Sequence, residues 1–196
     1  YISSKLKKRI PNYQDHFFLN SEYLELEYKN NKTQIKAKGK YSFNDKFEDY
    51  EINIINQKDQ YKFDSSINFK SNLINIEEID YKKSKDTSSV IKLKGHYIKN
   101  KDIIIDHAIY SEDKNKIAIS NLQLSKDYKI KDIDALELNY LNKNRRLNFI
   151  KISKIKDKYL LTGEHFDGES LVKNLLGGDS NNSFLKVFKN LNSEIE

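Results

Sequence analysis

From Glu22 to Phe166 the chain alternates between apolar and polar residues, and short turns rich in Asn, Asp and Lys separate the runs. Alternation of period two places successive side chains on opposite faces of a β-strand. A succession of such runs with no helical stretch between them predicts a mainly β fold, a long antiparallel meander of about nine to twelve strands. We expect this sheet to be twisted and curled into a gutter with one apolar face.

The same pattern divides the chain into three segments. Residues 1–19 form a connecting segment whose helical spacing is interrupted by Pro11. Residues 20–166 form the sheet. Residues 167–196 have the spacing of two short helices, the first capped by Asp167, which either cover one end of the sheet or bridge to a further module.

Turn positions predict which residues of neighbouring strands lie opposite each other. Each turn brings apolar residues together, and a slip of one residue would undo each match. The turns are placed at residues 30–31, 99–101, 112–114, 142–145 and 156–157. The predicted pairs are Leu26 with Ile35, Leu24 with Ala37, Tyr97 with Ile103, Gly95 with Ile105, Leu93 with His107, Ile91 with Ile109, Ile109 with Ile117, His107 with Ile119, Tyr140 with Leu147, Leu138 with Phe149, and Ile152 with Leu161.

Two irregularities interrupt the alternation. The apolar parity shifts between Ile76 and Ile79, between Ile119 and Leu122, and between Phe149 and Ile150, and such shifts indicate β-bulges. A weak repeat (KAKGKY at 36–41, KLKGHY at 92–97 and LLTGEHF at 160–166) places a Gly near the end of a strand. A Gly on an apolar row indicates a bend of the sheet or the close approach of a ligand, and a bend is the commoner cause.

Composition narrows the function classes. The 35 basic and 29 acidic residues are interleaved along the strands, and the net charge is only +6. A nucleic-acid surface would need clustered positive charge rich in Arg. The absence of Cys excludes disulfides and thiolate metal sites. The chain opens in a basic segment without Met and has no apolar run that would span a bilayer, so we expect a piece of a longer protein with any membrane anchor outside it.

The sequence contains His, Asp, Glu and Ser residues of the kinds that catalyse reactions or bind metals in other proteins, but their spacing does not predict a reactive site. His107 is expected on the apolar row and His96 on the other face, so the two cannot share a metal ion. His165, Asp167, Glu169 and Ser170 crowd one strand-to-helix junction, where helix capping is a simpler explanation than acid–base catalysis. No phosphate-binding loop or nucleophile elbow is present. We therefore expect no catalytic residues, no metal and no cofactor, and hence not an enzyme.

Three features of the chain are similar to the AsmA-like proteins of the Gram-negative envelope, especially their YhdP-type branch. These are the strand units that end in Gly39, Gly95 and Gly163, the K-x-K-G-x-Y then I-x-I cadence of Lys92–Ile105, and the closing segment Gly163–Leu171. The resemblance implies a periplasmic β-gutter attached to the inner membrane, whose apolar interior conducts phospholipid toward the outer membrane. It implies phospholipid acyl chains and other segments of the same longer chain as partners, and no catalytic residues.

Two functions follow from these expectations. The first is a segment of a lipid conduit, because so few helices leave much of the apolar face without protein cover. The alternative is a structural or assembly module of the cell envelope with a collapsed core and a protein-docking surface. For the conduit, the predicted lipid-facing residues are Leu24, Leu26, Ile35, Ala37, Ile52, Ile54, Phe63, Ile67, Ile91, Leu93, Ile103, Ile105, Ile109, Ile117, Ile119, Leu138, Phe149 and Leu161, with His107 as the one polar break.

Overall fold

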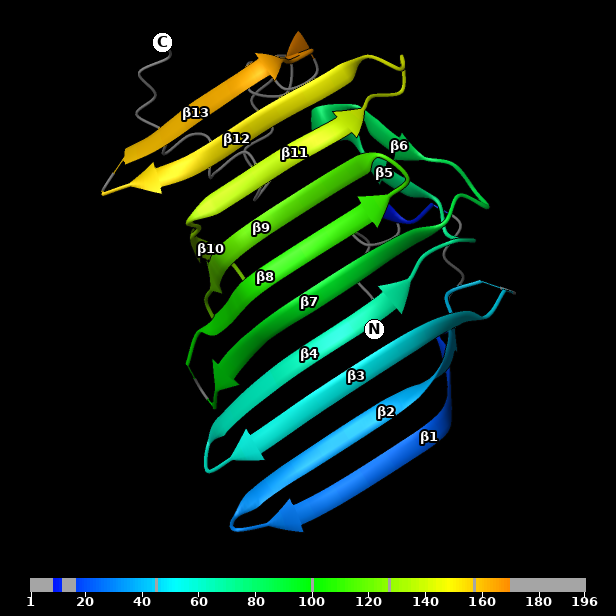
Figure 1. Ribbon diagram of the computed structural model, residues 1–196, viewed down its shortest axis with the longest axis vertical. Helices are drawn as coiled ribbons and strands as arrows, with labels where there is room; N and C mark the ends of the chain where they lie inside the picture. Colours follow the sequence, from blue (N-terminus) through cyan, green and yellow to red (C-terminus); the bar gives the residue numbers. More distant parts are fainter. Residues whose placement is uncertain are drawn as a thin grey trace.

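The computed structural model describes residues 9–11, 17–44, 46–99, 101–126, 128–156 and 158–169. Within them one antiparallel sheet of 11 strands runs in the order β1-β2-β3-β4-β7-β8-β9-β11-β12-β13, and β10 also pairs with β9 (Figure 1). Its strands are β1 (Phe18–Lys29), β2 (Lys32–Ser42), β3 (Glu48–Gln57), β4 (Gln60–Asn68), β7 (Ser89–Ile98), β8 (Ile103–Glu112), β9 (Asn115–Leu124), β10 (Ile130–Asp132), β11 (Ala135–Leu141), β12 (Leu147–Ile155) and β13 (Lys158–His165).

The predicted antiparallel meander is confirmed, but the predicted gutter is wrong. The sheet is open and is not strongly curled (Figure 1). A reason is visible in the chain path, because a crossover segment covers part of the apolar face and the sheet need not close on itself. The predicted helices of residues 1–19 and 167–196 lie almost entirely outside the described residues.

The crossover segment, residues 69–88, leaves the main sheet between β4 and β7. Residues 73–81, where the parity shift between Ile76 and Ile79 predicts a bulged strand, instead contain β5 (Ile74–Ile76) and a short 3-10 helix, η1 (Glu77–Ile79), and lead into β6 (Tyr81–Lys83). The parity shift at Ile76 and Ile79 is this helical turn, not a bulge. The β5–β6 hairpin forms a separate two-stranded sheet and lies behind the main sheet in Figure 1.

The buried core lies between this crossover segment and the second half of the main sheet. Ile79 and Tyr81 of the crossover pack with residues of β8, β9, β11 and β12. The buried members of this cluster are Ile79, Tyr81, Tyr110, Leu122, Ile133, Leu136, Leu138, Tyr140, Ile150 and Ile152. This half of the protein is therefore two-layered, with the main sheet as one layer and the crossover as the other.

Each glycine of the sequence repeat lies beside a β-bulge. The register shifts between Ser21 and Tyr23 next to Gly39, between Lys94 and Gly95, and between Phe149 and Ile150 next to Gly163. A Cβ added to any of the three would clash with a backbone carbonyl oxygen of the neighbouring strand. The cause is close approach of another strand where the ladder is irregular, rather than a ligand.

Bulges and turn lengths together decide where the predicted pairing fails. The turn pairs Leu26–Ile35, Gly95–Ile105 and Ile152–Leu161 are confirmed. The extra residue Asp106 then shifts β8, so that Leu93 lies opposite Ala108 rather than His107. The remaining corrected pairs are Ile91 with Tyr110, Tyr110 with Ile117, Ile119 with Ala108, Tyr140 with Asn148, and Leu138 with Ile150.

Replacing Gly95 by Ala is expected to destabilise the protein by about 1–3 kcal/mol, the usual cost of overpacking. The new methyl group would meet the carbonyl oxygen of Ile104 and lie 2.7 Å from Cζ of Phe63. Urea denaturation followed by circular dichroism measures the change. Gly168→Ala is the matched control, because the nearest atom there is on the Phe166 ring, at 3.0 Å. An equal loss in both variants would contradict this account.

Candidate functional site

The register gathers most of the predicted lipid-facing residues on one face of the sheet, which we call the apolar face. One row runs from Leu26 through Ile35 and Ile54 to Phe63, directly across β1 to β4. The predicted residues that lie on this face are Leu24, Leu26, Ile35, Ala37, Ile52, Ile54, Phe63, Ile67, Ile91, Leu93, Ile103, Ile105, Ile117, Ile119, Leu138 and Leu161.

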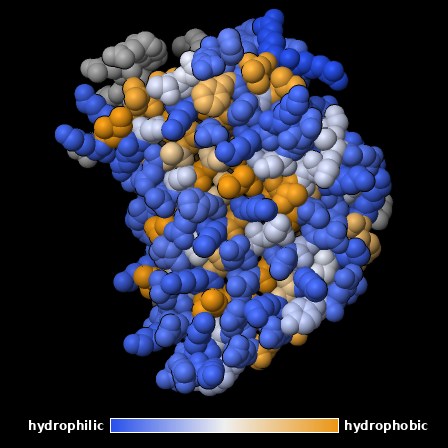
Figure 2. Space-filling model, viewed as in Figure 1, coloured by the Kyte–Doolittle hydropathy of each residue, from blue (hydrophilic) through white to orange (hydrophobic). Residues whose placement is uncertain are grey.

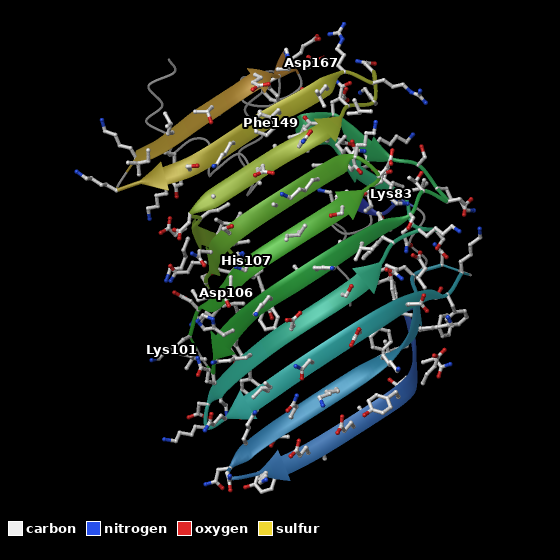
Figure 3. The ribbon with its side chains drawn as sticks, in the orientation of Figure 1. Lys83, Lys101, Asp106, His107, Phe149 and Asp167 are labelled. Carbon is white, nitrogen blue, oxygen red and sulfur yellow. The ribbon has the colours of Figure 1, made fainter. Side chains whose placement is uncertain are left out.

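The placement of Ile109 and Phe149 on this face was wrong. Ile109 lies opposite Lys92 and Phe149 lies opposite Asn139, both on the polar face. The bulge at Asp106 changes the parity of β8, and the loop between β11 and β12 is one residue longer than expected. The polar face is turned to the viewer in Figure 2, where small hydrophobic patches interrupt a mainly hydrophilic surface, and Figure 3 labels Phe149 in the same view.

The histidines also change place. His107 lies opposite Lys94, on the polar face, and His96 lies opposite Ile104 on that same face. The prediction that the two histidines lie on opposite faces is therefore wrong. His96 Nδ1 lies 3.3 Å from Oδ1 of Asp106, so the bulged residue has a local partner. Among the described residues no group of three or more His, Asp or Glu side chains is placed to hold a metal ion.

The apolar face is covered in one half and open in the other. Leu138 on β11 is only 2% exposed beneath the crossover segment. Leu24 and Leu26 on β1 are 67% and 69% exposed. Isolated exposed apolar residues are common on proteins, but a contiguous row along neighbouring strands indicates a contact surface. The open half, formed by β1 to β4, is therefore the candidate functional surface.

A groove marks the boundary between the two halves. It has a volume of about 800 Å³ and opens at the end of the sheet where the β3–β4 and β7–β8 turns meet. Ile54, Phe63 and Ile103 provide its apolar wall, and the Tyr61 and Tyr97 rings stack with centroids 5.5 Å apart. The complete lining is Ile54, Tyr61, Phe63, Tyr97, Lys101, Ile103, Lys126 and Tyr128. A groove of this size accommodates a drug-sized or single acyl-chain ligand.

A buried lysine that the sequence analysis did not single out holds the crossover segment together. Lys83 is fully buried, and its Nζ donates to the carbonyl oxygens of Lys70, Asn72 and Ser84 at 2.8–2.9 Å. Burial lowers the pKa of this ammonium group, and the charges of Glu112 and Glu48 oppose that shift. Its donors are occupied by backbone, so we assign Lys83 a structural role. A single Lys in a polar stretch gives no sequence signal for such a role.

A buried carboxylate at the start of β3 attaches the crossover segment to the main sheet. Glu48 accepts hydrogen bonds from the backbone N–H groups of Lys70 and Ser71, from the Ser71 hydroxyl and from the Asn72 amide. Hydrogen bonds to an ionised acceptor are stronger than neutral ones. The beginning of the crossover segment is therefore fixed to the main sheet by one acidic side chain.

Three tyrosines fill the space under the crossover. The Tyr81 hydroxyl lies 2.7 Å from that of Tyr110 and donates to Glu112, and the Tyr140 hydroxyl donates to the carbonyl oxygen of Ile79 at 2.7 Å. Burial raises the pKa of Tyr81, Tyr110 and Tyr140 above the usual phenol value. These neutral, hydrogen-bonded phenols are typical of a core rather than of an acid–base site.

The junction at the end of β13 also has a structural use. Asp167 accepts hydrogen bonds from Asn142 and Arg146, each at 3.2 Å, and its backbone N–H donates to Asn148. Figure 3 shows Asp167 beside the β11–β12 end of the sheet. The carboxylate thus fixes the loop between those strands. The predicted helix after it lies outside the described residues, apart from its first positions.

Comparison of the chain with protein-family models, with curated proteins and with solved structures finds no match. In the described part of the chain no helix is both long and apolar enough to cross a membrane. The apolar face, its groove and the residues around them are therefore the features that indicate a function.

Proposed function

We propose that this chain is a non-enzymatic segment of a periplasmic protein attached to the inner membrane, whose open apolar sheet face carries phospholipid toward the outer membrane. The observation that supports this best is the apolar row of β1 to β4, which is exposed at Leu24 and Leu26, half-buried on β2 to β4, and leads into the groove at Phe63 and Ile103. The similarity of the glycine-ended strand units to AsmA-like proteins supports the envelope setting.

The corrected register makes the lipid path more uniform than the sequence suggested. His107, the expected polar break, lies on the other face. Ser65, between Ile52 and Leu93, places a small hydroxyl on the row instead. An acyl chain gains roughly 0.8 kcal/mol for each methylene group that leaves water, so a continuous apolar row favours lipid along its length.

The crossover segment limits where lipid can bind. Leu138 and Ile150 are buried in the protein core, so the β11–β12 part of the apolar face has protein contacts already. The proposed lipid surface is therefore the open half and the groove, rather than the whole predicted row. In this respect the protein combines a closed core with a lipid-binding face.

Photo-crosslinking in bacterial membranes tests the proposal. A photoreactive amino acid at Leu26, Ile54 or Phe63 should capture phospholipid. At Lys36 or Lys94, on the polar face, it should capture none, and mass spectrometry of the adduct identifies the captured molecule. Absence of lipid at all three apolar positions would favour the alternative.

The alternative is a structural or assembly module of the envelope. The core around Tyr81 and Leu138 favours it, because in that half of the protein the crossover segment already covers the apolar face. A partner protein would then cover the β1 to β4 face. Native mass spectrometry of the purified chain separates the two, since only a lipid carrier retains acyl chains.

A further inference from the structure

Two lysines lie at the rim of the apolar groove and place positive charge at one of its margins. Lys101 comes from the turn between β7 and β8, and Lys126 comes from the segment after β9. The opposite wall is apolar, formed by Ile54 and Phe63. Figure 3 shows Lys101 at the edge of the sheet, near the start of β8. The groove thus combines a hydrocarbon wall with positive charge at one margin.

The positive charge at this margin is not neutralised by the carboxylate nearest in sequence to Lys101. Asp102 instead accepts from Lys131 at 2.6 Å and from Gln123 at 2.7 Å. In the part of the chain that the structure describes, neither Lys101 nor Lys126 has a carboxylate within ion-pair distance, and Asp127 falls outside that part. Other lysines of this sheet do form such pairs, as Lys36 does with Glu25 and Lys116 with Glu137.

The aromatic residues complete the site. Tyr128, which is two residues after Lys126 and 75% exposed, lines the same groove. Tyr61 and Tyr97 present a stacked pair of rings with apolar bodies and polar tips. Side chains of this kind are favoured where one end of a ligand is apolar and the other is in water.

We propose that the groove binds an anionic phospholipid, with the phosphate of its headgroup at Lys101 and Lys126 and an acyl chain along Ile54, Phe63 and Ile103. This inference rests on the proposed function and adds headgroup selectivity to it. Lys ammonium groups bind phosphate as point charges, while the acyl chain gains from leaving water. A net negative lipid is therefore preferred to a zwitterionic one with the same chain, whose cationic group would lie close to the lysines.

Calorimetric titration of the purified chain with two single-chain lipids of equal length tests this inference. Both lipids are used below their micelle concentrations. Lysophosphatidylglycerol should bind about three- to tenfold more tightly than lysophosphatidylcholine, the range expected for two solvent-exposed charge contacts. The double variant Lys101→Gln/Lys126→Gln should lose this preference and keep its affinity for lysophosphatidylcholine. The control Lys92→Gln/Lys151→Gln makes the same change of net charge on exposed lysines of the polar face and should keep the preference.

The possible outcomes distinguish a failure of the headgroup site from a failure of the proposed function. Binding of both lipids with equal affinity, unchanged in the double variant, would overturn the headgroup site and leave the proposed function standing. Binding of neither lipid would contradict the proposed function itself. Glycerol 3-phosphate is titrated as the head without a tail, and an affinity equal to that of lysophosphatidylglycerol would show a phosphate site without lipid selectivity and overturn the inference. Equal loss of preference in the control variant would assign the effect to net charge and also overturn it.

Discussion

Replacing Leu138 by Asp is expected to unfold the protein or to destabilise it by about 4 kcal/mol or more. Leu138 is 2% exposed and lies between Ile117 and Ile150 on the covered half of the apolar face. The substitution removes a packed side chain and introduces a carboxylate with no charged partner in its row. Thermal and urea denaturation, followed by far-ultraviolet circular dichroism, measure the loss.

The matched control is Lys92→Glu on the polar face. Lys92 is exposed and lies opposite Ile109, and no ion pair involving it is found among the described residues. Surface substitutions of this kind usually change stability by about 0.5 kcal/mol or less. Comparable losses in the Leu138 and Lys92 variants would mean that the two faces have been assigned wrongly.

Replacing Lys83 by Met is expected to destabilise the protein by roughly 3–5 kcal/mol. Met has a similar length but no donor, so the carbonyl oxygens of Lys70, Asn72 and Ser84 lose their shared partner. The negative charge of Glu48 would also lose a nearby counter-charge. The crossover segment should loosen first, and limited proteolysis should then cut within residues 69–88 before the main sheet unfolds.

Lys82→Met tests whether position within β6 alone explains such an effect. Lys82 is the preceding residue on the same strand and is exposed. Its substitution should leave both the denaturation midpoint and the proteolytic pattern close to those of the unchanged protein. Early cleavage of residues 69–88 in the Lys82 variant, or its absence in the Lys83 variant, would contradict the role assigned to the buried ammonium group.

The candidate groove could be anticipated only in part. Alternation placed Ile54, Phe63 and Ile103 on one face, and the structure agrees because side-chain direction in a strand depends on local backbone geometry alone. The lysines of its rim gave no signal. Lys101 and Lys126 lie in separate turns, and only the pairing of β7, β8 and β9 brings those turns to the same end of the sheet.

The sequence by itself determined the antiparallel meander, most of its apolar face and the turn at Asn30–Asn31, since these depend on period-two alternation and on residues that accept positive φ. Only the tertiary structure decided the faces of Ile109 and Phe149, because one extra residue at Asp106 and one in the β11–β12 loop move these two side chains to the polar face. It also decided that residues 69–88 leave the sheet and cover half of its apolar face. Local alternation there resembles a strand, but burying Tyr81 and satisfying Lys83 favours packing across the sheet.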